Sequence, residues 1–117
     1  MQRAGTGAAG ALTGDEQHEL TSTLWRWQSA GGTAWWFVSV DGVAADALSA
    51  TALVRRLESG RRAGFGSVKV AVRIGGSRWQ TSAFPMKEEG WSIPVKAAVR
   101  KAEGLNEGDP VTITIGF

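Results

Sequence analysis

Hydrophobic and polar residues alternate through much of this chain with the period of two that is typical of β-strands. The clearest case runs from Val68 to Ile74, where four β-branched residues alternate with lysine, alanine and arginine. Gly75-Gly76 follows, and its freedom to adopt positive φ predicts a two-residue hairpin leading into an antiparallel strand over residues 77–84. Pro85 cannot donate to a ladder, so we expect that strand to break or bulge there.

The same alternation predicts strands over residues 20–28, 35–40 and 111–115. Trp25 and Trp27 share one face of the first of these strands, and Trp35 and Trp36 lie on opposite faces of the second. A strand is also expected just before Pro94.

Apolar residues three and four positions apart predict a helix after Asp41, which can cap it. We expect this helix to pack on the sheet through a stripe made of Val43, Ala47, Ala50, Val54 and Leu57. A shorter helix is expected over residues 95–102, because Pro94 suits a first helical turn and Gly104 tolerates the left-handed conformation that ends a helix. Its solvent side would carry Lys96, Arg100 and Lys101.

The strand-then-helix order occurs in both halves of the chain, which indicates a barrel with pseudo-twofold repeats. With 117 residues we expect a single β-barrel domain over residues 19–117. Residues 1–18 are rich in Gly and Ala, so they offer too little apolar area to offset the entropy of ordering. We therefore predict a flexible tail there, with the single histidine, His18, solvated at its end.

Composition excludes several classes of protein. There is no cysteine, so disulfides, thiolate metal sites and cysteine nucleophiles are ruled out, and with one histidine we expect no metal and no cofactor. The 13 basic and 11 acidic residues leave a net charge of +2, a weak footprint for nucleic acid, so we expect no nucleic-acid partner. No apolar run approaches the ~20 residues that span a bilayer, and we expect a cytoplasmic protein without a membrane partner.

Three segments taken together resemble DUF1905, a family of domains of unknown function found in bacteria and archaea. They are residues 64–70, residues 79–85, and residues 93–101 followed by Gly108-Asp109. The resemblance covers roughly residues 20–117 and implies a double-split β-barrel, mainly β with two short helices. That fold is shared with swapped-hairpin transition regulators and antitoxins of the AbrB type. The resemblance implies no activity.

The first repeat departs from the second, because Asp41-Gly42 stands where a proline is expected. A glycine loosens the start of a helix, and we interpret this departure as drift rather than as an adaptation to a ligand.

Six tryptophans and no tyrosine are the unusual feature of the composition. Buried indole N–H groups need acceptors, so we expect some of these rings to line a groove in which one edge of the ring contacts water. Trp36 and Trp79 are the foremost candidates for ligand contact. The full candidate set also contains Trp25, Trp27, Trp91, Phe65 and Arg26.

Basic residues form a second cluster. The favoured interpretation is a solvated basic face, and the more specific alternative is contact with nucleic acid or phosphate. Its members are Arg55, Arg56, Arg61, Arg62, Lys69, Arg73 and Arg78.

Three function classes stay open. The favoured one is a small binding module whose tryptophan-lined pocket takes an apolar small molecule or a protein partner. The second is a cofactor-free enzyme of cyclase or isomerase type, which would enclose a hydrophobic substrate and use Arg26, Gln28 or Glu89, although no catalytic motif is recognisable. The third is a DNA-binding protein of the AbrB type. The chain is expected to be a monomer or a homodimer.

Overall fold

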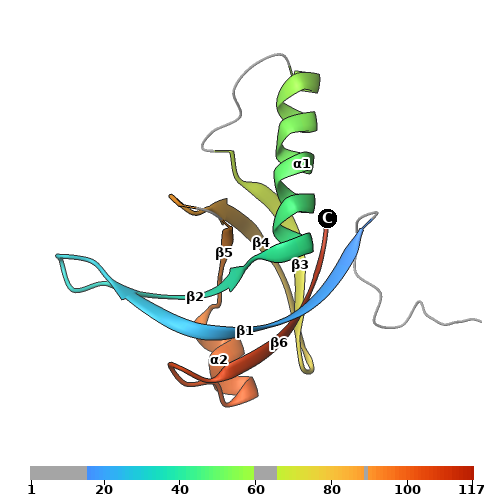
Figure 1. Cartoon of the computed structure of the whole chain (residues 1–117). Helices are drawn as coiled ribbons and strands as arrows, with labels where there is room; N and C mark the ends of the chain where they lie inside the picture. The colour runs from blue at the N-terminus through green and yellow to red at the C-terminus, as the bar shows by residue number, and fades with distance from the viewer. Residues whose placement is uncertain (1–15, 60–65, 89) are drawn as a thin grey trace, which may run out of the picture.

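Six antiparallel strands close into a barrel in the computed structural model, which describes residues 16–59, 66–88 and 90–117 (Figure 1). Around the barrel the order is β1-β2-β5-β4-β3-β6, so the first and last strands are neighbours. The strands are β1 (Gln17–Gln28), β2 (Ala34–Val40), β3 (Val68–Ile74), β4 (Ser77–Pro85), β5 (Trp91–Pro94) and β6 (Pro110–Gly116). The expectation of a mainly β barrel with two helices is confirmed.

Strand register decides which side chains fill the interior. Val72 pairs with both Trp79 and Ile115, and Val38 pairs with both Leu24 and Ile93, so each set points to one side of the sheet. These side chains are buried and form the core. The hairpin between β3 and β4 has positive φ at Gly75 (56°) and not at Gly76, as in a type II′ turn.

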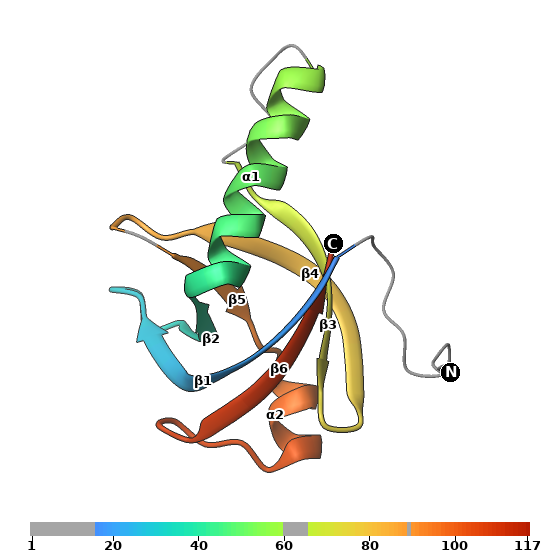
Figure 2. The ribbon, with the colours of Figure 1, turned by 45° about the vertical axis from the view of Figure 1, so that its right-hand side comes forward.

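The two halves of the chain occupy equivalent places in the barrel. Exchanging β1, β2 and β3 with β4, β5 and β6 turns the order β1-β2-β5-β4-β3-β6 into the same closed ring read in the opposite direction. The helices follow the same rule, since each lies between the second and third strand of its half. They sit at opposite ends of the barrel (Figures 1 and 2). This order is compatible with a double-split barrel.

The first helix, α1 (Gly42–Ser59), does not pack through the predicted stripe. Its buried residues are Ala44, Ala45 and Leu48, whereas Val43 is 75% exposed and Leu57 is 71% exposed. Both sets of residues satisfy helical spacing, but the small side chains of the alanines let the helix backbone lie close against the barrel. The last turns of α1 extend beyond the end of the barrel (Figure 2).

The second helix, α2 (Ala97–Glu103), begins later than predicted. Pro94 ends β5, and the N–H of Val95 still donates to the carbonyl of Trp36 on β2 at 2.8 Å, so the chain stays extended past the proline. The helix starts only after its N-cap, Lys96. Its end is as predicted, with Gly104 left-handed at φ 64°.

Side-chain hydrogen bonds fasten α2 and the turn after it. Glu103 accepts from the Ser77 hydroxyl at 2.7 Å, which joins the last turn of α2 to the hairpin between β3 and β4. The carboxylate of Asp109 accepts from the backbone N–H of Asn106 at 2.8 Å and so caps that turn.

The barrel begins slightly before the predicted boundary. Gln17 and His18, which we assigned to the tail, belong to β1 and pair with Gly116 and Ile115. The His18 ring stacks on Phe117 with centroids 5.6 Å apart, so it is held rather than solvated. The rest of the predicted tail, residues 1–15, lies outside the described residues. Of the helices described, neither has the length and apolar character needed to cross a membrane.

Candidate functional site

The alternation of side chains along β1 and β2 divides the tryptophans between two faces of the barrel wall. Trp25 pairs with Phe37, and Trp27 pairs with Trp35, on the outer face. The rings of Trp25 and Phe37 stack with centroids 4.8 Å apart, and Trp27 is 51% exposed. Trp36 lies on the opposite face of β2, the same face as the core residue Val38.

A hollow of about 260 Å³ brings Trp36 and Trp79 together, and we call it the tryptophan hollow. Strand pairing explains why the two tryptophans lie close together, since β5 lies between β2 and β4 and the segment after β5 leads into α2. The hollow is lined by Ala34, Trp35, Trp36, Trp79, Gln80, Thr81, Pro94, Val95, Lys96 and Arg100. These residues come from β2, β4, the end of β5 and α2.

Arg100 gives the hollow a fixed positive charge. Its guanidinium carbon lies 4.4 Å from the centre of the Trp36 ring, within cation–π range, and its Nε donates to the carbonyl of Val95 at 3.2 Å. The backbone N–H of Arg100 donates to the carbonyl of Lys96 at 3.1 Å, so the two basic residues lie one helical turn apart. Arg100 was expected on the solvent side of its helix, and the structure shows it only partly exposed because its guanidinium lies over the ring of Trp36.

Indole hydrogen bonding separates Trp36 and Trp79 from two other tryptophans. Trp25 donates to the hydroxyl of Ser39 at 2.9 Å, and Trp91 donates to that of Ser49 at 3.0 Å. Within residues 16–59, 66–88 and 90–117, the indole N–H groups of Trp36 and Trp79 have no acceptor. Trp79 is only 9% exposed, so this N–H without an acceptor belongs to a largely buried residue that lines the hollow.

The remaining candidate residues do not line the tryptophan hollow. Arg26 lies 6.0 Å from the Trp36 ring and also pairs with Glu107, Nε to Oε1, at 3.7 Å. Trp25 and Trp27 lie on the outer face of the barrel. Trp91 is buried inside the barrel near α1. Phe65 lies outside the described residues.

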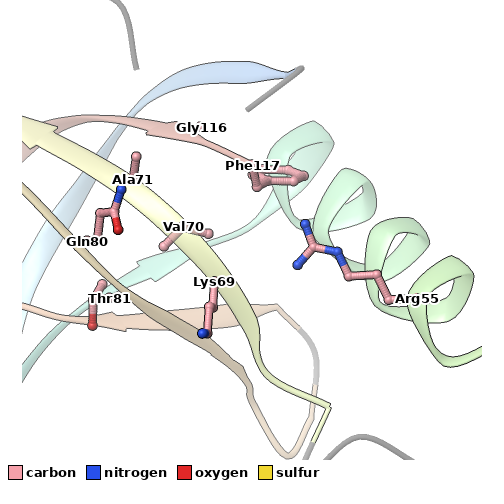
Figure 3. A pocket seen from close by; sticks show the side chains of 8 residues that line it. All are labelled: Arg55, Lys69, Val70, Ala71, Gln80, Thr81, Gly116 and Phe117. Atoms are coloured by element: carbon pink, nitrogen blue, oxygen red, sulfur yellow. The ribbon is translucent and has the colours of Figure 1, made fainter. Parts of the chain in front are cut away.

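Two other hollows lie beside α1. One, of about 310 Å³, combines Trp91 with the acidic residues Asp41 and Asp46 at the start of the helix. The other, of about 220 Å³, lies between α1 and the outer side of β3. Figure 3 shows Arg55 reaching from α1 toward Phe117, with Lys69 on β3.

Arg55 and Lys69 are thus the members of the predicted basic cluster that share a hollow. Arg61 and Arg62 of that cluster lie outside the described residues. Neither hollow beside α1 contains two tryptophans.

Sequence reasoning missed the basic side of the tryptophan hollow. The signal was present as Lys96 and Arg100 four residues apart, but the same spacing is usual on a solvated helix face. Only the pairing of β5 with both β2 and β4 brings α2 next to Trp36 and Trp79.

Comparison with known proteins gives a family and no activity. The family described as "Domain of unknown function (DUF1905)" matches residues 21–115, which run from β1 to β6 and include the tryptophan hollow. No curated protein matches the chain.

Proposed function

This chain belongs to the DUF1905 family, and from that premise we propose that its domain is a small binding module. The tryptophan hollow takes a small molecule with a flat apolar body and one anionic group. The observation that carries this proposal is Arg100, whose guanidinium is stacked on Trp36 and held by the carbonyl of Val95 at the edge of an apolar hollow.

The chemistry of the lining supports both parts of the ligand. Trp36, Trp79 and Val95 offer apolar and aromatic surface for a ring. Arg100 and Lys96 offer donors to a carboxylate or a sulfonate, and the N–H of Trp79 offers a further donor to any acceptor beside it. The volume of about 260 Å³ lies just below the usual range of ligand pockets, so a body of one or two rings fits best.

The enzyme and DNA alternatives have less support. Arg26 and Gln28 lie on β1 and do not line the tryptophan hollow, and Glu89 lies outside the described residues. The paired residues Arg73 and Arg78 lie on the outer face of the hairpin, which would be the surface for DNA. Neither arrangement makes use of Trp36 and Trp79.

The test compares indole-3-acetate with its neutral isostere, indole-3-acetamide. Protein labelled with ¹⁵N gives one indole N–H signal per tryptophan, six in all, so a titration reports which rings contact the probe. We expect the signals of Trp36 and Trp79 to shift, and the acetate to bind about tenfold more tightly, since a hydrogen bond to a charged group contributes ~1.5–3 kcal/mol.

Arg100→Gln should reduce the preference for the anion to the contribution of Lys96 and leave binding of the amide unchanged. Arg78→Gln is the matched control, because Arg78 is exposed on β4 and does not line the hollow. Shifts confined to Trp25 and Trp27, or an anion preference that is undiminished in Arg100→Gln, would overturn the proposal.

A further inference from the structure

Helix α1 carries apolar residues on two opposite faces. The inner face contains Ala44, Ala45 and Leu48, which are buried against the barrel. At about 100° per residue, the face turned away from the barrel contains the stripe Val43, Ala47, Ala50, Val54 and Leu57. The spacing of four, three, four and three residues along this outer stripe is the heptad spacing of a coiled-coil seam.

The outer stripe is exposed where its side chains are largest. Val43 and Leu57 are mostly exposed, Val54 is 50% exposed, and Leu53 beside the stripe is 51% exposed. The last turns of α1 stand clear of the barrel in both views (Figures 1 and 2). A helix that is apolar on both sides normally lies between two layers, and the barrel supplies one of them.

We propose that a second copy of this chain supplies the other layer, through an antiparallel pairing of the outer stripes of two α1 helices. With the twofold axis at residue 52, Ala47 lies across from Leu57 of the partner subunit and Ala50 lies across from Val54 of the partner subunit. Each small side chain then meets a larger one, which is how facing helices interdigitate. The stripe complements itself, as a twofold contact between identical chains requires.

Charge favours the same arrangement over a parallel one. The first half of α1 and its cap carry Asp41 and Asp46, and the second half carries Arg55, which reaches toward the barrel, together with Arg56 and Glu58. Antiparallel pairing keeps the acidic starts of the two helices apart and opposes the two helix dipoles, whereas parallel pairing would bring both together. The residues that flank the axis, Thr51 and Leu53, are uncharged, so the approach buries no charge there.

The size of the contact predicts how strong the dimer is. An 18-residue helix is about 27 Å long, and one pair of such helices buries less than the ~1,200 Å² of a standard stable interface. We therefore expect a reversible dimer with a dissociation constant of roughly 10 µM to 1 mM. Sedimentation velocity across that range should show a rising weight-average mass.

Leu57→Lys should weaken the dimer at least tenfold, because each dimer would then bury two ammonium groups. Trp27→Lys is the matched control, since Trp27 is also about half exposed but lies on the outer face of the barrel wall. A chain that is monomeric at 1 mM, or a dimer lost in Trp27→Lys and kept in Leu57→Lys, would overturn the proposal.

Cysteine cross-linking tests the direction of pairing in a chain that has no cysteine of its own. In a glutathione redox buffer, Ala50→Cys and Val54→Cys should each remain uncross-linked alone and should form a disulfide when the two variants are mixed. Disulfides within each single variant would indicate parallel helices and contradict the proposed register.

Discussion

Trp36 and Trp79 line the same hollow, yet they hold different positions in the protein. Trp79 points into the barrel beside Val72 and belongs to the buried core. Trp36 is only partly buried and packs against that core from near the start of β2. Trp79 therefore has a structural role in addition to its proposed binding role, whereas Trp36 contributes mainly surface and a face for Arg100.

This difference predicts unequal losses of stability. Trp79→Ala should lower the free energy of unfolding by ~3–5 kcal/mol, the usual cost of removing a buried tryptophan. Trp36→Ala should cost clearly less, because part of the ring is already in water. Urea denaturation measures both, with Trp27→Ala as an exposed control. Equal losses of unfolding free energy in Trp36→Ala and Trp79→Ala would contradict the placement of Trp79 in the core and of Trp36 at its edge.

At the scale of elements, α1 shows what spacing along a sequence can and cannot decide. The three- and four-residue spacing correctly predicted a helix after Asp41. It did not decide which stripe faces the barrel, because Ala44, Ala45 and Leu48 satisfy the same geometry as Val43, Val54 and Leu57. Larger side chains suggested the wrong face, since the close approach of the helix to the barrel needed small ones.

Two leucines on the same helix give a direct check on α1. Leu48 is fully buried, so Leu48→Ala should cost ~2–5 kcal/mol of unfolding free energy. Leu57→Ala should change it by less than ~0.5 kcal/mol at low micromolar protein, where the proposed dimer is dissociated. Chemical denaturation followed by far-UV circular dichroism gives both values. A large loss for Leu57 under these conditions would show that the outer stripe packs within one chain.

Turns and helix ends that depend on local chemistry could be predicted from the sequence, whereas a helix start that depends on a distant residue could not. The hairpin at Gly75 and the end of α2 at Gly104 follow from local chemistry, and both were predicted. The start of α2 was not, because the hydrogen bond that keeps Val95 extended comes from Trp36, which is far away in the sequence.

At the scale of the whole molecule, strand pairing joins the two halves of the chain. Of the six strand pairings, β1 with β2 and β4 with β5 lie within a half, and the other four cross between halves. The candidate site depends on these crossings, since Trp36 comes from the first half and Trp79 and Arg100 from the second. The sequence named Trp36 and Trp79 as candidates, and the strand pairing places both beside one hollow together with Arg100.

We expect unfolding in a single cooperative step, because neither half can complete a barrel alone. Far-UV circular dichroism, which reports the strands and helices, and tryptophan fluorescence should give the same midpoint in urea. Two separated transitions would mean that one half keeps its structure after the other is lost.

Glu103 links α2, which borders the tryptophan hollow, to the hairpin between β3 and β4. It follows Arg100 by three residues on the short helix α2 and accepts a hydrogen bond from the hydroxyl of Ser77 at the hairpin tip. Both residues lie on one rigid helix of two turns, so we expect the proposed ligand, where it draws Arg100 inward, to shift Glu103 as well. The amides around Gly75 and Ser77 would then report occupancy of the hollow by hydrogen exchange, at a place away from the proposed ligand.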